Sequence, residues 1–262
     1  HHSSGVTGIQ QGVVDDLLEP WLLSLAARRG SELAPNTLIA AARLLRTGVT
    51  SVVEVHSGGG SAAGYAAGVR RALEAYDRSG IRVAFATGIT NQSFIVSGGP
   101  GDDEKFIASL PPEVRPYAQA EMPAPGDVTP DEYFTIVEEA FHAYREHPRI
   151  RVWFAPPGPQ WVSEGFMGEI GQRAAALDTN IQTHVEESYY EKLHGPRTYG
   201  KPVMLYLRDL GVLSPRFSVA HGVWLTEAEI AAMAETGAAI SHNPSSNLRL
   251  RAGIAPLNAL LA

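Results

Sequence analysis

The chain has 262 residues, a formal net charge of −7 and no cysteine. The absence of cysteine excludes disulfides and thiolate metal ligands. The acidic balance, without a basic cluster, argues against a nucleic-acid partner. We find neither an apolar run long enough to span a membrane nor a signal-peptide pattern at the start, so we expect a cytoplasmic protein without a membrane partner.

Helix and strand signals alternate along the chain, with capping residues between them. We expect helices over 37–47, 61–79, 129–147, 201–210 and 226–237, and another that starts after Ser163. The expected N-caps include Asn36, Ser163, Thr129 and Thr226, the last two in capping boxes with Glu132 and Glu229. Short apolar runs predict strands over 50–55, 82–86, 151–155, 180–185, 217–220 and 238–241.

Single helices between short apolar strands indicate parallel pairing. Either a closed barrel or a doubly wound sheet would satisfy this pattern. Polar residues follow consecutive strands, and a closed ring would bring them together at one rim, which favours the barrel. We therefore expect one domain over 1–262, a (β/α)8 TIM-type barrel that lacks its eighth strand, with the Gly- and Pro-rich segment 91–130 as a long insertion over the barrel mouth.

Three successive strand ends carry the residues that suggest chemistry. The first places His184 three residues before Glu187, the second ends at His221, and the third leads into His242-Asn243-Pro244. A hydrolytic metal site needs neutral imidazoles, a carboxylate and an open position for water. A nearby carboxyl group must then carry a proton to the leaving group. We expect His184 to be a metal ligand, and Glu187 and His221 to be catalytic.

Other polar residues are candidates for substrate contact. His56 follows a strand, Gln160 lies in a Gly-Pro-Gln loop, and His242 and Asn243 follow the last strand. A single histidine at a strand end is more often a structural hydrogen-bonding residue than a ligand, and His242 could simply bond the turn after it. These residues are therefore expected to line a site only in combination with the histidine and glutamate motifs.

The motif His184-Val-Glu-Glu187 resembles the His-x-x-Glu motif of the amidohydrolase superfamily. It is most similar to the branch that holds triazine hydrolases and the aminopurine, guanine and cytosine deaminases. Further motifs of that branch have counterparts here in the same order. They are similar to the run 45–53, to Ala220-His221-Gly222, and to the run 241–250 together with 253–256. The resemblance implies a barrel with a small β-sandwich, absent here, and one divalent metal, zinc or iron. It also implies a small-molecule substrate and a homo-oligomer. His184 would be a ligand, Glu187 the proton shuttle and His221 the residue that orients water or substrate.

The chain departs from the family pattern in three places. The family starts its barrel with His-x-His, and we interpret His2 as the second ligand of that pair, although His1-His2 could also be the remnant of an expression tag. The first histidine and the family's ligating aspartate lie outside these residues. Gln160 stands where relatives that act on aminated purines often have histidine.

Together these features predict a metal-dependent hydrolase of carbon–nitrogen bonds other than peptide bonds, most simply a deaminase of a small nitrogen heterocycle. One alternative is hydrolysis of a cyclic amide, as in imidazolonepropionase. The other is a non-catalytic barrel fragment, because two expected ligands lie outside the chain and these 262 residues alone are not expected to be active.

Overall fold

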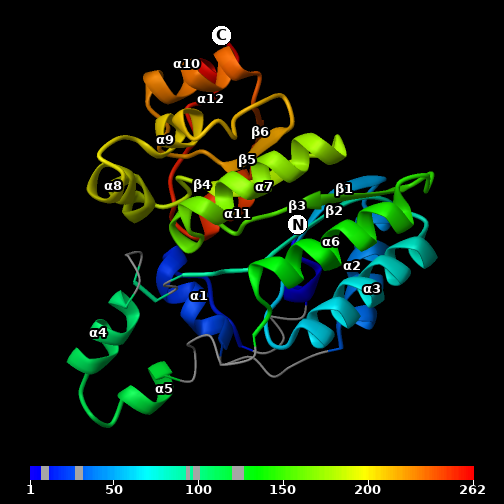
Figure 1. Cartoon of the computed structure of the whole chain (residues 1–262), viewed down its shortest axis with the longest axis horizontal. Coiled ribbons are helices and arrows are strands. Elements are labelled where there is room, and N and C mark those ends of the chain that lie inside the picture. Colours follow the sequence, from blue (N-terminus) through cyan, green and yellow to red (C-terminus); the bar gives the residue numbers. More distant parts are fainter. Residues whose placement is uncertain (7–11, 27–31, 93–94, 97–100, 120–126) are drawn as a thin grey trace. The chain divides into compact units, whose positions relative to one another are not determined.

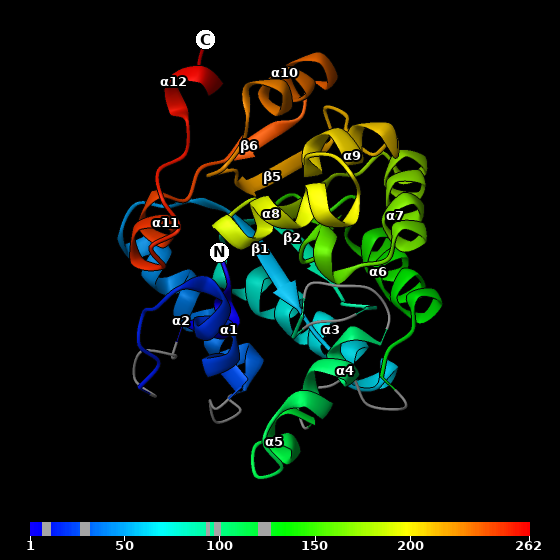
Figure 2. The same cartoon turned by 90° about the vertical axis from the view of Figure 1, so that its left-hand side faces the viewer.

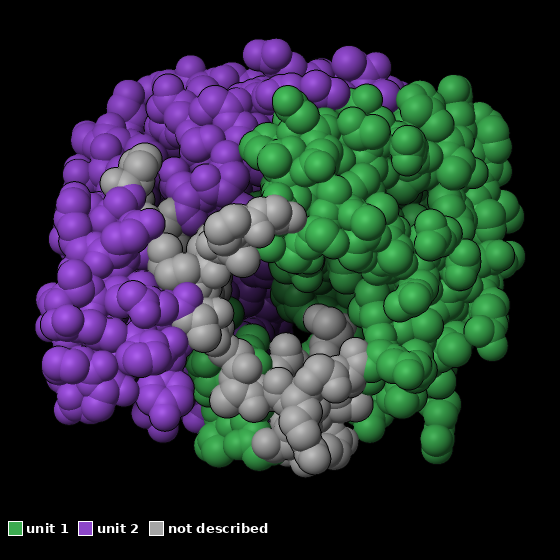
Figure 3. Space-filling view, turned by 60° about the horizontal axis from the view of Figure 1, so that its bottom comes forward, with its two compact units in different colours: residues 1–14, 22–89, 124–155 green, residues 15–21, 90–123, 156–262 purple. Residues whose placement is uncertain are grey.

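The computed structural model describes residues 1–6, 12–26, 32–92, 95–96, 101–119 and 127–262. The chain forms two compact units (Figure 3). Unit 1 contains residues 1–14, 22–89 and 124–155, and unit 2 contains 15–21, 90–123 and 156–262. Each unit is described by itself, and the expected single domain stays a prediction. Within these described ranges, no helix is both long and apolar enough to cross a membrane.

Unit 1 is built on three parallel strands that neighbour one another in chain order. They are β1 (Ser51–Ser57), β2 (Arg82–Gly88) and β3 (Ile150–Phe154). Its helices are α2 (Leu33–Arg46), α3 (Ala62–Ser79) and α6 (Pro130–Tyr144), preceded by a 3-10 turn, η1 (Ser3–Gly5). Helix α3 packs against α2, α6, β2 and β3 (Figure 1). Helix α1 (Leu18–Ala26) contains a boundary between the units.

The strands of unit 1 bury both faces. Toward the helices, an aromatic layer includes Tyr76, Phe85 and Phe154, each fully buried. On another face, Val55 clusters with Ala86 and Ala155. Burial on both sides explains why these strands have apolar runs instead of strict alternation, as is usual for parallel sheets covered by helices.

Unit 2 repeats the parallel pattern with β4 (Ile181–Val185), β5 (Phe217–His221) and β6 (Ala239–Ser241). Helix α7 (Glu164–Leu177) packs on β4, and α9 (Val203–Asp209) packs on α10 (Glu227–Thr236) (Figures 1 and 2). The remaining elements are α4 (Asp102–Ser109), α5 (Arg115–Gln119), η3 (Pro159–Trp161), α8 (Tyr189–Thr198), α11 (Pro244–Arg249) and α12 (Leu257–Leu260).

Most expected capping residues act as predicted. The side chains of Ser163, Thr129 and Thr226 each accept a backbone N–H at a helix start, the last two in complete capping boxes. The prediction for Asn36 was wrong. Helix α2 starts at Leu33, four residues before the expected start, with Glu32 at the N-cap and no side-chain cap bond, and Asn36 is buried inside the helix. A helix also forms at 189–198, where none was expected.

The expected insertion 91–130 contains the short helices α4 and α5. Its first residues are tied to the loop after β3, because Asn91 Nδ2 donates to Ser163 Oγ and Gln92 Nε2 donates to the Gln160 carbonyl, both at 2.9 Å. Residues 93–94, 97–100 and 120–126 lie outside the described part of the chain. The placement of the segment over a barrel mouth therefore stays a prediction.

Candidate active site

His184 lies in β4 and has the hydrogen bonding of a metal-binding imidazole. Its Nδ1 is 2.8 Å from the carbonyl oxygen of Pro157. A carbonyl can only accept, so Nδ1 carries the proton and the lone pair is on Nε2. Burial lowers the pKa of His184 to about 4, so the ring is neutral at pH 7. A neutral imidazole whose other nitrogen is bonded to a backbone carbonyl is the usual form of a histidine ligand.

His221 reaches the same place through a break in the strand pleat. The register pairs His184 with Ala220 and His221 with Val185, so a continued pleat would turn the two histidines to opposite faces. The backbone leaves the extended conformation at His221, where φ is 74°. The ring centroids of His184 and His221 are 5.4 Å apart. This contact was expected from the strand order, but the backbone conformation that permits it was not.

Glu187 is a buried carboxyl beside His221. Its Oε1 is 3.2 Å from His221 Nδ1, and the residue is 4% exposed. Burial, followed by the nearby carboxylates Glu191 and Glu19, raises the pKa of Glu187 well above its usual range. Burial also lowers the pKa of His221 to about 3. The pair therefore consists of a carboxyl group that holds its proton more tightly than usual and a neutral imidazole, and such a carboxyl group is suited to carry a proton.

The turn that carries Glu187 is held by Glu191, one turn into α8. Glu191 Oε2 accepts the backbone N–H of Glu187 at 2.6 Å and that of Ser188 at 3.3 Å. Ser188 caps the helix in a capping box with Glu191, and its hydroxyl donates to Glu19 Oε1 at 2.5 Å. The Ser-x-x-Glu pattern was visible in the sequence and could have identified this support for Glu187.

Gln160 belongs to the same network. Its Nε2 donates to Glu191 Oε1 at 2.6 Å, and the residue is buried. This bond gives Gln160 a role in holding Glu191. The substrate contact expected of it stays a prediction.

Several buried polar atoms around the histidines of unit 2 have no partner in the part of the chain that the structure describes. They are Gln182 Oε1, His242 Nδ1 and Asn247 Nδ2. Asn247, which sequence reasoning missed, accepts from His221 Nδ1 through Oδ1 at 2.7 Å. Asn243 starts α11 without a side-chain cap bond. Orphaned buried groups are rare and indicate places for water, an ion or a ligand. The contacts expected of His242 and Asn243 stay predictions.

His2 is described in unit 1. The amino group of His1 donates to the Val53 carbonyl at 3.1 Å, and the His1 carbonyl accepts the Val55 N–H at 2.8 Å. This parallel pairing sets His1 opposite Glu54. Because His2 is also extended, it falls on the other face, that of Val53 and Val55. Its role as a ligand stays a prediction.

His56, also in unit 1, lies among aromatic residues. Its ring stacks on Phe85 and Tyr65 with centroid distances of 5.4 and 6.4 Å. Burial lowers the pKa of His56 to about 4. Its Nδ1 is buried and has no hydrogen-bond partner among the described residues, and the substrate contact expected of His56 stays a prediction.

No three histidine, aspartate or glutamate side chains of the described residues are grouped to hold a metal ion. The chemistry of individual donors nevertheless fits one. His184 is neutral and has its Nδ1 proton bonded to a carbonyl, and unpartnered polar atoms lie in the same unit. Such nitrogen donors suit zinc and iron alike.

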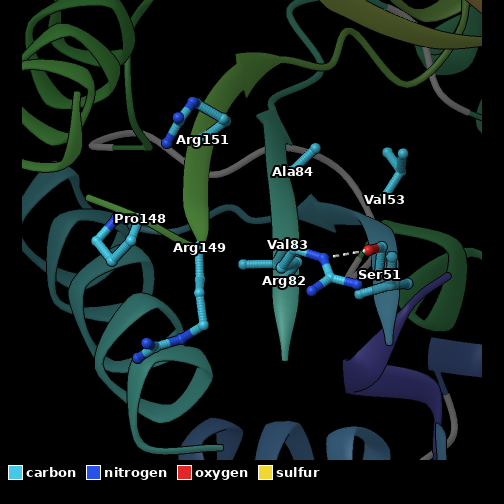
Figure 4. A pocket seen from close by; sticks show the side chains of 9 residues that line it. Ser51, Val53, Arg82, Val83, Ala84, Pro148, Arg149 and Arg151 are labelled. Carbon is cyan, nitrogen blue, oxygen red and sulfur yellow. Dashed lines mark hydrogen bonds between the residues drawn. The ribbon is translucent and has the colours of Figure 1, made fainter. Parts of the chain in front are cut away.

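Unit 1 contains a cavity of about 410 Å³. Its lining comes from the amino ends of β1, β2 and β3 and includes Arg82, Arg149 and Arg151 (Figure 4). The arginines are engaged within the chain: Arg82 Nε donates to Ser51 Oγ at 2.8 Å. In barrel enzymes the amino ends of the strands serve stability, so we do not assign the active site there.

Comparison with known proteins shows extended similarity to deaminases. A 5'-deoxyadenosine deaminase from Methanothermobacter thermautotrophicus is 30% identical over 257 residues, covering 96% of this chain and 51% of that protein. A 5-methylthioadenosine/S-adenosylhomocysteine deaminase from Nitratidesulfovibrio vulgaris is 28% identical over 268 residues, covering 100% and 52%. The chain thus spans about half the length of the curated relatives it matches.

Solved structures support the fold. An adenosine deaminase from Xanthomonas campestris with bound zinc aligns with a TM-score of 0.76 at 27% identity, covering 99% of this chain and 52% of that one. A zinc complex of an atrazine chlorohydrolase from Arthrobacter aurescens TC1 aligns with a TM-score of 0.73 at 21% identity, covering 99% and 56%, a likeness of fold alone. The six parallel strands are therefore a partial TIM barrel, which confirms the barrel over the doubly wound sheet. The sequence pattern of the Amidohydrolase family matches residues 6–262, and the chain belongs to that family.

Proposed function

We propose that the protein hydrolyses a carbon–nitrogen bond in a small nitrogen heterocycle and releases ammonia. The observation that carries this proposal is the pair Glu187 and His221, a buried carboxyl 3.2 Å from a neutral imidazole, with His184 next to it. Relatives named as deaminases of adenosine-type compounds support the same reaction class.

His2 and His184 are the residues that would hold one divalent metal, zinc first and iron as the alternative. The support is the Nδ1 bond of His184 to the Pro157 carbonyl, which places the lone pair on Nε2, the atom that would bind the metal. A divalent metal bound there would supply activation of a water molecule for attack on an electrophilic carbon.

Glu187 would carry the proton. Its raised pKa favours the protonated carboxyl group, and that proton can pass to the leaving nitrogen, which departs as ammonia. The carboxylate left behind takes up a proton released by the attacking water. One amine and one water thus yield one carbonyl group and one ammonia, with Glu187 restored.

His221 would orient the water. Its Nδ1 proton is donated to Asn247 Oδ1, so the lone pair on Nε2 can accept a hydrogen bond. Because the pKa of His221 is lowered to about 3, the ring stays an acceptor across the physiological range. The expected homo-oligomer and cytoplasmic location belong to the same proposal.

The substrate class can be tested by product analysis. Protein expressed from the complete reading frame is incubated with adenosine, 5'-methylthioadenosine, guanine, cytosine and a cyclic amide, and ammonia and new carboxylate are measured separately. Ammonia equal to the amine consumed supports the proposal. Carboxylate without ammonia means amide hydrolysis. No turnover by folded, metal-loaded protein means a non-catalytic barrel, and either of these results overturns the proposal.

A further inference from the structure

Glu186, between the two motif residues His184 and Glu187, has no part in the proposed chemistry. Its side chain is fully buried and its backbone is left-handed, with φ of 50°. Glutamate rarely adopts this conformation, and such strain persists only where the surroundings hold it. The contacts of Glu186 are therefore informative about how the turn is maintained.

Lys192, in α8, bridges Glu186 to a second buried carboxyl. Its Nζ donates to Glu186 Oε1 and Oε2 at 3.3 and 3.2 Å, and to Glu229 Oε2 at 2.9 Å. Both carboxyl side chains are fully buried, whereas the lysine side chain is 19% exposed. Glu229 is anchored in turn, because it completes the capping box of α10 and accepts the Met204 N–H.

The backbone at Glu186 joins the ends of two strands. Its carbonyl accepts the N–H groups of Val223 and Trp224 at 3.0 and 3.3 Å, and the Gly222 N–H is 3.1 Å from the Val185 carbonyl. The turn after β5 starts at His221, which is itself left-handed. Two strained turns, one before Glu187 and one at His221, are thus bonded to each other.

We propose that Lys192 is a positioning residue. By binding the buried carboxyl groups of Glu186 and Glu229 it links the turn after β4 to α10, holds the two strained turns together, and keeps Glu187 beside His221. The expected loss of kcat rests on the proposed function, whereas the expected loosening of the two turns does not. Apolar residues of similar size often stabilise a protein as much as a buried ion cluster does. We therefore attribute the cluster to positioning of the turns and not to stabilisation of the fold.

The test uses the double variant Glu186→Leu/Lys192→Met in protein from the complete reading frame. It removes Lys192 and one of its two carboxyl partners, and Glu229 keeps its hydrogen bonds from Thr226 and from the Met204 N–H. Lys192→Met alone leaves the two buried carboxyl groups of Glu186 and Glu229 facing each other and could unfold the chain. The matched control is Glu169→Gln, which breaks the partly exposed ion pair with Arg173 on α7, at 2.7 Å. Thermal unfolding, kcat, KM and hydrogen exchange of the Val223 and Trp224 amides are measured.

We expect the double variant to fold, to lose about 10- to 100-fold in kcat with little change in KM, and to exchange both amides faster, as for other residues that support a site. The control should match wild type. A folded double variant with wild-type kcat and wild-type amide protection would overturn the proposal. If wild type itself converts no amine, the proposed function fails, but the exchange rates still decide: unchanged protection refutes the role of Lys192, and lost protection supports it.

Discussion

Replacing Glu187 with glutamine tests the proton shuttle most sharply. The amide has the size of the carboxyl and can keep the 3.2 Å contact with His221, and the backbone bond to Glu191 is unaffected. Burial raises the pKa of Glu187, so below pH 4.5 one neutral group replaces another. We expect the free energy of unfolding below pH 4.5 to change by no more than about 1 kcal/mol.

Activity should respond very differently. Loss of a general acid–base group lowers rates by about 10²–10⁴-fold, which corresponds to about 3–5 kcal/mol in the activation barrier. Ammonia release by Glu187→Gln is compared with wild type at equal metal content. Wild-type kcat in a folded variant would refute the role of Glu187.

The same variant predicts a change in pH dependence. The pKa of Glu187 is raised in the folded protein, mainly by burial, so its proton is bound more tightly there than in the unfolded chain. Its contribution to stability is full below the ordinary carboxyl pKa of 4.5 and is lost as pH rises through the raised value. Wild type should therefore become less stable relative to Glu187→Gln as pH increases above 4.5. Parallel stability curves in urea denaturation would contradict the buried, protonated state.

Two further predictions concern other contacts. Tyr76→Phe removes the 2.8 Å hydrogen bond to the buried carboxyl of Glu54 and should lower the free energy of unfolding by about 1–3 kcal/mol. Urea denaturation measures this change, and an unchanged midpoint would show that the bond does not stabilise the fold. Asn247→Ala removes the hydrogen-bond acceptor 2.7 Å from His221 Nδ1 and should lower kcat about 10- to 100-fold. Nitrogen NMR should also show a change in the tautomer of His221. Wild-type kcat with an unchanged tautomer would contradict this role of Asn247.

Local signals predicted most of the scaffold. The capping boxes at Thr129 and Thr226 and the serine cap at Ser163 depend on residues within one helical turn, and the structure confirms all three. Asn36 failed as a cap because α2 extends upstream to Leu33 without any capping side chain. The helix 189–198 was missed because Pro196 and a neighbouring glycine weaken its propensity, although Ser188 and Glu191 form a capping box at its start.

The site was predictable where it depends on strand order, and not where it depends on backbone conformation or distant partners. The strand ends at His184 and His221 could be predicted to meet. The left-handed backbone at Glu186 and His221 could not, because neither residue type favours it. The roles of Asn247 and Lys192 could not be predicted either, because their partners are distant in sequence. Asn247 bonds His221, 26 residues away, and Lys192 bonds Glu229, 37 residues away.

We propose that this barrel holds a metal through His184 and uses it for hydrolysis. The most direct measurement is elemental analysis of tightly bound metal in protein expressed from the complete reading frame. We predict about one zinc or iron per chain, lost in His184→Ala and retained in Glu187→Gln. Well-folded protein without metal, or metal content that His184→Ala leaves unchanged, would contradict the account.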